Sequence, residues 1–111
     1  MSHSTETGIS IAMCTCPSDE VGQKIANALV TERLAACVNQ ISGVQSTYLW
    51  QGALHNDAEI LLVIKTTTEK LATVAARIKA LHPYEVPEFI ALPVHGGSES
   101  YLQWVRQNVE N

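Results

Sequence analysis

The stretch from Cys37 to Trp50 constrains the fold more than any other part of the chain, because it is long and carries no charged residue. Its β-branched and aromatic residues favour a strand, and the Ser42–Gly43 pair marks a bend or bulge within it. The Gln51–Gly52 pair then predicts a tight hairpin turn, after which a second long strand returns from Ala53 to Thr67. The chain is therefore expected to fold around an antiparallel sheet.

Two further strands flank this hairpin in the sequence. Residues 9–16 alternate in the manner of a largely buried strand. Ser18 is the expected N-cap of a helix whose apolar positions recur through about Ala36. Pro87–Val94 is the expected fourth strand, and the prolines at its two ends place it at a sheet edge.

Two more helices complete the pattern. Thr67 or Thr68 is the expected cap of the second helix. This helix must stop at His82, because Pro83 lacks a backbone N–H and disfavours helical geometry in the residue before it. Ser98 is the expected cap of a terminal helix.

The resulting element order predicts the fold class α+β, a ferredoxin-like βαββαβ sandwich with an added C-terminal helix. In this arrangement the first and third strands lie in the middle, and the second and fourth lie at the edges. An uncharged edge as long as Cys37–Trp50 invites pairing with another chain. We therefore expect a subunit interface there, which a closed ring of like subunits would satisfy.

Composition narrows the class of protein. The length of 111 residues suits a single domain, expected at 9–111, after a loose polar tail at 1–8. The net charge is −4 and the seven basic residues form no run, which argues against nucleic acid. No apolar run is long enough for a membrane span, the N-terminus does not resemble a secretory signal, and the three cysteines suit a reducing cytoplasm.

Six blocks of sequence, taken in order and spacing, closely resemble the CutA family of divalent-cation tolerance proteins. The blocks are CTCP (14–17), LAACVN (34–39), STYLWQG (46–52), EILLVIKTT (59–67), HPYEVPE (82–88) and YLQW (101–104). The resemblance covers about residues 9–107. It implies a ferredoxin-like subunit in a tight homotrimer, assembled through the long second and third strands.

The resemblance also implies a copper site, formed in bacterial family members by a strand cysteine and two adjacent histidines before the proline. The matching residues here are Cys14, Leu81 and His82, so one histidine is replaced by leucine. Cys16 lies on the same strand face as Cys14 and is a candidate replacement donor. Thiolate and imidazole suit copper or zinc. The alternatives are cysteines that act as small buried hydrophobes, and a histidine that acts as a cation at a helix C-terminus.

A second candidate site is a cleft between subunits, of the kind that commonly binds a ligand. Its expected residues come from the hairpin, the third strand and the segment after the proline: Trp50, Glu59, Lys65, Tyr84 and Glu88. Glu59 and Lys65 share a strand face but are too far apart to pair within the strand, so each is expected to reach elsewhere. The alternative is that these residues form interface salt bridges and packing contacts.

No catalytic pattern is present: the sequence has no nucleophile with a matching base, no Walker-type loop and no GxGxxG motif. Together with the resemblance to the CutA family, this leads us to expect a cytoplasmic trimer without enzymatic activity that binds a divalent transition metal and contributes to metal tolerance. The alternative functions are a PII-like signalling trimer that binds a small molecule or nucleotide between subunits, and a structural protein that anchors partners.

Overall fold

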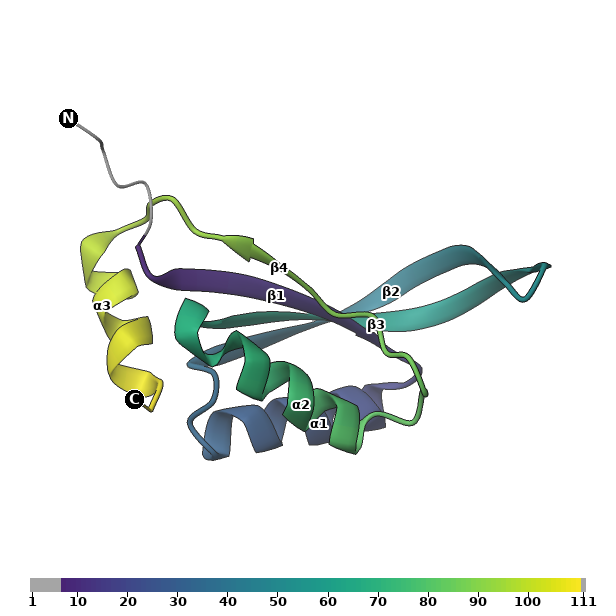
Figure 1. The fold of residues 1–111 in the computed structure, drawn as a ribbon, viewed down its shortest axis with the longest axis horizontal. Coiled ribbons are helices and arrows are strands. Elements are labelled where there is room, and N and C mark those ends of the chain that lie inside the picture. Colours follow the sequence, from purple (N-terminus) through teal and green to yellow (C-terminus); the bar gives the residue numbers. More distant parts are fainter. Residues whose placement is uncertain (1–6, 111) are drawn as a thin grey trace.

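The computed structural model describes residues 7–110. The longest feature of its fold is a twisted hairpin of two strands, β2 (Cys37–Trp50) and β3 (Ala53–Thr67) (Figure 1). The register shifts between Ile41 and Val44, and Gly43 has a φ of 84° there, so the predicted bulge is confirmed. At the tip Gln51 and Gly52 have φ values of 51° and 81°, as a tight hairpin turn requires. The hairpin extends well beyond the rest of the sheet.

The sheet has four strands in the order β2-β3-β1-β4, where β1 is Ile9–Cys16 and β4 is Ile90–Pro93. All neighbouring strands are antiparallel. The predicted placement of the first and third strands in the middle and of the other two at the edges is confirmed. Strand β4 is shorter than the predicted Pro87–Val94.

Two helices cover one face of the sheet, α1 (Asp19–Thr31) and α2 (Leu71–Leu81) (Figure 1). The apolar faces of both helices pack on alternate residues of β1 and β3, because successive strand residues point to opposite faces. The centre of this core is fully buried and includes Cys14, Cys16, Ile25, Leu29, Leu62, Ile64, Val74 and Ile78.

The third helix, α3 (Glu99–Asn108), closes the end of the sheet at which β1 begins (Figure 1). Leu102 and Val105 pack there against Ile9 and Ala36 in a second, smaller core. Ser98 caps this helix by accepting a hydrogen bond from the backbone N–H of Tyr101, as predicted.

The predicted caps at Ser18 and Ser98 and the predicted stop of the second helix at His82 are confirmed, whereas the predicted end of the first helix is wrong. Ser18 caps α1 as expected. However, α1 ends at Thr31 and not near Ala36, because Arg33 adopts a left-handed φ of 59° that turns the chain out of the helix.

The start of the second helix also differs from the prediction. A 3₁₀ turn, Thr68–Lys70, precedes α2, and Thr67 occupies the N-cap position of this turn as predicted, but its side chain forms no capping hydrogen bond. The Thr68 hydroxyl instead forms a 2.8 Å hydrogen bond with the hydroxyl of Ser10, which ties this turn to β1.

Residues 1–6 of the predicted tail lie outside the described residues. Thr7 and Gly8 belong to the folded domain, because Thr7 Oγ1 donates to the carbonyl of Val94 at 2.8 Å and the Gly8 carbonyl accepts from Thr68 N at 2.8 Å. These two residues of the predicted tail are thus hydrogen-bonded to the domain. Among the helices of residues 7–110, none has the length and apolar character needed to cross a membrane.

The opposite side of the sheet carries neither α1 nor α2, and we call it the helix-free face. The register places on it Ile11, Met13, Thr15, Asn39, Ile41, Glu59, Leu61, Val63, Lys65, Ile90 and Leu92. Ile41, Ile90 and Leu92 are 45%, 55% and 51% exposed. In the single chain this face is thus an apolar surface that remains open to water.

Candidate metal cluster and acidic pocket

The predicted metal ligands Cys14 and His82 lie close to the candidate donor Cys16 beneath the helices. We call these three residues the thiol cluster. Cys14 and Cys16 lie on β1 and point toward the helix-covered face, where both are fully buried. His82 is the C-cap of α2 and is also buried. One ligand atom from each of the three residues lies within 4.8 Å of the others.

His82 holds two hydrogen bonds, one through each ring nitrogen. The backbone N–H of Tyr84 donates to His82 Nδ1 at 3.1 Å, so Nδ1 is unprotonated and the proton lies on Nε2. Nε2 then donates to the carbonyl oxygen of Thr15 at 2.7 Å. The ring is therefore a neutral connector between the Pro83 turn and β1, and not the cation at a helix C-terminus that one interpretation of the sequence favoured.

The two thiols interact directly. The hydrogen bond with Cys16, followed by burial and by the charges of Glu88 and Glu59, raises the pKa of Cys14 above its usual range. The same hydrogen bond lowers the pKa of Cys16. A metal that binds both sulfurs as thiolates must therefore displace the proton of Cys14, which burial and the neighbouring negative charges help to retain.

The residues beside the cluster explain why it has only three donors. Leu81 packs against the helix-covered core and offers no ligand atom. Cys37 is half-buried at the start of β2, in a different strand, and all three cysteines are free thiols. The cluster is thus a soft-donor set, S₂N, within one chain.

A second site lies on the other side of the sheet, and we call it the acidic pocket. It has a volume of about 440 Å³ and is lined by Thr15, Tyr48, Trp50, Glu59, Tyr84, Glu85, Val86 and Glu88. Four of the five residues predicted for a cleft are therefore brought together. Three aromatic rings and three carboxylates line it, and none of the lining residues within 7–110 is Lys, Arg or His.

Glu59 and Tyr84 form the centre of this pocket. Glu59 is 7% exposed, and its Oε2 accepts a hydrogen bond from the Tyr84 hydroxyl at 3.1 Å. Burial, the hydrogen bond with Glu59 and the charge of that carboxylate together raise the pKa of Tyr84 to about 12. Tyr48, on the neighbouring strand, donates its hydroxyl proton to Asp57 and stacks on His55 with ring centroids 5.3 Å apart.

Lys65, the fifth predicted residue, does not line the pocket. Its ammonium group donates to the side-chain oxygen of Asn39 on β2. The expectation that Glu59 and Lys65 each reach elsewhere is thus confirmed within the chain. Sequence reasoning missed Tyr48 as a lining residue, although its position two residues before Trp50 places both on one face of β2.

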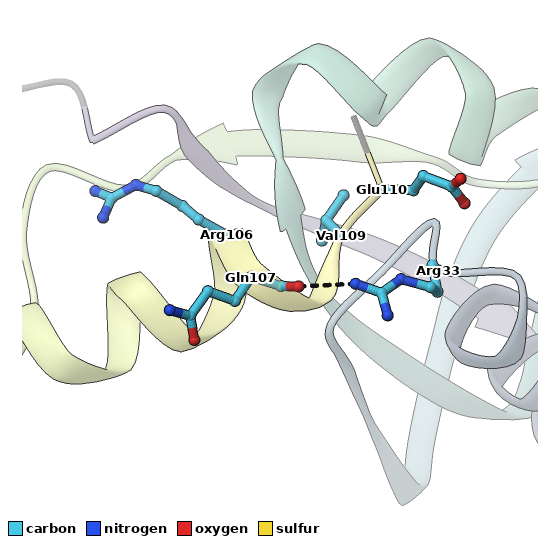
Figure 2. A pocket seen from close by; sticks show the side chains of 5 residues that line it. All are labelled: Arg33, Arg106, Gln107, Val109 and Glu110. Carbon is cyan, nitrogen blue, oxygen red and sulfur yellow. Dashed lines mark hydrogen bonds between the residues drawn. The ribbon is translucent and has the colours of Figure 1, made fainter.

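A wider hollow of about 720 Å³ lies at the end of α3, far from either site, and Figure 2 shows its lining residues. The guanidinium of Arg33 donates to the carbonyl of Gln107 at 2.8 Å, and the Arg33 carbonyl accepts from Glu110 N at 2.9 Å. Arg106 points away from Arg33 and donates to the Thr7 carbonyl at 3.1 Å. These contacts join α3 to the loop after α1, so we assign the hollow a structural role.

The fold and the thiol cluster define a small mixed α+β domain, with a four-stranded antiparallel sheet, three helices and a buried soft-donor set. The family described as CutA1 divalent ion tolerance protein matches residues 10–108 of this chain. The chain belongs to this family of CutA proteins, as the sequence resemblance indicated.

Individual relatives support the assignment. The chain is 52% identical over 98 residues to the divalent-cation tolerance protein CutA of Thermus thermophilus, covering 88% of this chain and 95% of that protein. It is 47% identical over 103 residues to protein CutA of Homo sapiens, covering 93% of this chain and 58% of the human protein. A crystal structure of CutA1 from Oryza sativa superposes with a TM-score of 0.92 at 41% identity, covering 97% of this chain and 99% of that one.

Proposed function

We propose that this chain acts in divalent-cation tolerance as a homotrimer of ferredoxin-like subunits without enzymatic activity, and that it binds copper or a similar soft transition metal at the thiol cluster. The observation that carries the proposal is the convergence of two thiols and an imidazole within 4.8 Å. A set of this kind prefers Cu(I), Cu(II) or Zn(II) to the hard cations Mg²⁺ and Ca²⁺.

The donor set fits a metal through its sulfurs more readily than through its imidazole. Cys14 and Cys16 would hold the metal as thiolates. His82 could join through Nδ1 by losing the hydrogen bond from Tyr84 N–H, whereas binding through Nε2 would move the ring proton to Nδ1 and lose both hydrogen bonds. Bound at this place, the metal would be shielded from solvent by α1 and α2.

The trimer is supported by the apolar surface that a single chain leaves open. This surface includes the helix-free face and also the hairpin tip, where Leu49 and Leu54 are 70% and 67% exposed. Contiguous apolar surface of this extent is typical of an interface between protein chains. Light scattering at micromolar concentration should report the mass of three chains, and a stable monomer would contradict this part of the proposal.

The free thiols support a reducing compartment, and we propose the cytoplasm. The PII-like alternative is not favoured by the acidic pocket. Phosphate groups are bound by cationic side chains or by backbone N–H groups, whereas the described residues that line this pocket include three glutamates and no Lys or Arg.

Removal of one thiol tests the metal site. Cys14→Ser should lower Cu(I) affinity at least tenfold, measured anaerobically by competition with a chromophoric chelator. Cys37→Ser is the matched control, because it removes a thiol from another strand and should leave the affinity unchanged. Melting temperatures of both variants separate a lost ligand from a lost fold. Full Cu(I) affinity in a folded Cys14→Ser protein would contradict the site.

The same site should respond to pH. The raised pKa of Cys14 means that a bound metal must displace a proton that the folded chain holds tightly. Affinity should therefore fall as pH decreases and rise as pH increases, with the release of up to about two protons per metal ion. Chelator competition at a series of pH values measures this slope, and an affinity independent of pH would argue against thiolate ligands.

A further inference from the structure

We infer that Lys65 of one copy of the chain enters the acidic pocket of the next copy and supplies the cation that the pocket lacks. This inference rests on the trimer of the proposed function and adds which charged groups meet at each interface. It assigns the five residues predicted for one cleft to two neighbouring chains, four from one copy and Lys65 from the other.

The pocket is electrostatically incomplete in a single chain. Glu59 is 7% exposed, and the hydrogen bond that its carboxylate accepts comes from the neutral hydroxyl of Tyr84. Glu85 and Glu88 add two more carboxylates to the same walls. The ion pairs found between described residues are Arg77–Glu32 and Arg106–Glu99, so no described lysine or arginine forms an ion pair with the carboxylates of the pocket. A buried carboxylate without a cation is costly, which favours an incoming positive charge.

Lys65 is the matching group on the same helix-free face. It is half-buried, and its register neighbours on either side are Ile11 and Cys37. Its ammonium group contacts the neutral side chain of Asn39 and forms no ion pair with a described carboxylate. The chain thus carries a cation without an anion and an anion without a cation on one open surface.

These two groups cannot meet within one chain. Glu59 and Lys65 lie six positions apart along strand β3, which corresponds to roughly 20 Å. In a head-to-tail contact each copy offers Lys65 to one neighbour and its pocket to the other, and contacts of this kind close into a ring. The stretch between them, which includes Leu61 and Val63, would be covered by the same contact.

A zero-length carbodiimide, which joins an amine directly to a carboxylate, tests the contact. The purified full-length protein, assembled from a mixture of unlabelled and ¹⁵N-labelled chains, would be treated and analysed by peptide mass spectrometry. We expect cross-links from Lys65 to Glu59, Glu85 or Glu88 with mixed isotope labels. Lys24, exposed on the opposite side in α1, is the internal control and should not cross-link to these residues.

Charge reversal gives an independent readout. Lys65→Glu should raise the protein concentration at which the assembly dissociates at least tenfold, and Lys24→Glu, with the same change in net charge, should leave it unchanged. Circular dichroism checks that both variants fold. An intact trimer with no Lys65 cross-link and no effect of Lys65→Glu would overturn the inference while leaving the proposed trimer in place. A wild-type monomer would instead overturn the trimer itself.

Discussion

The thiol cluster and the acidic pocket lie on opposite faces of the same sheet and differ in how completely one chain satisfies them. Cys14 and Thr15 are adjacent in β1, yet Cys14 belongs to the cluster and Thr15 lines the pocket. The cluster is buried, neutral and hydrogen-bonded within the chain. The pocket gathers carboxylates around one neutral hydroxyl partner.

This difference shows what the helices provide. On the covered face, α1 and α2 exclude water and pack the thiols among apolar side chains, so neutral groups can be satisfied locally. On the helix-free face, apolar and charged groups remain open to water in the single chain, which makes them available to the second copy proposed above. One face therefore holds the main core of the chain, and the other carries the surface on which the proposed assembly depends.

The largest effect should come from deleting a side chain on the covered face. Leu62→Ala should lower the free energy of unfolding by about 2–5 kcal/mol, because Leu62 is fully buried between sheet and helices. Leu61→Ala, one residue earlier and on the helix-free face, should cost a single chain less and weaken assembly instead. Chemical denaturation and light scattering of both variants measure the two effects. Equal loss of chain stability in both variants would contradict the assignment of roles to the two faces.

A smaller effect should follow from adding a donor beside the thiol cluster. Leu81→His places a second imidazole next to His82 and should tighten copper binding about tenfold, which is about 1.4 kcal/mol. Some stability should be lost, because Leu81 packs against the core. Leu81→Asn is the matched control, since it removes the same packing without adding an imidazole. Equal copper affinity in both variants would place the metal elsewhere.

The smallest effect concerns the ionisation of Tyr84. Its pKa is raised from the usual value of about 10 to about 12 in the folded chain. The contribution of the neutral phenol to the stability of the folded chain is therefore fully present below about pH 10 and is lost as pH rises through 12. Glu59→Gln should lower the pKa of Tyr84, because it removes the negative charge that opposes ionisation, while burial keeps part of the shift. Absorbance titration of phenolate, with Tyr84→Phe subtracted, measures it.

The same titration sharpens the comparison between the faces. If Lys65 of a neighbour enters the pocket, its positive charge lowers the pKa of Tyr84 below the value in an isolated chain. Lys65→Gln should therefore raise the pKa of Tyr84 toward 12, in the direction opposite to Glu59→Gln. A pKa that does not respond to Lys65→Gln would argue against a cation in the pocket.

Most of the fold could be predicted from local sequence signals. The hairpin at Gln51–Gly52, the bulge at Gly43 and the caps at Ser18 and Ser98 were predicted correctly, because each depends on a few neighbouring residues. The end of α1 was not, because the apolar spacing continues beyond Thr31 while the backbone at Arg33 turns left-handed. The Arg33 carbonyl accepts from Glu110 at the far end of the chain, a contact that no local pattern contains.

The sequence alone determined the order of the elements, the sheet topology that follows from it, the family, and the residue types available for a soft metal. These follow from side-chain periodicity and from chemistry that each residue carries wherever it lies. Only the tertiary structure decided that His82 lies at Thr15, 67 residues away, with both ring nitrogens occupied, and that Lys65 lies apart from the pocket. The physical reason is that hydrogen bonding and charge compensation depend on distance in space, which a sequence pattern does not specify.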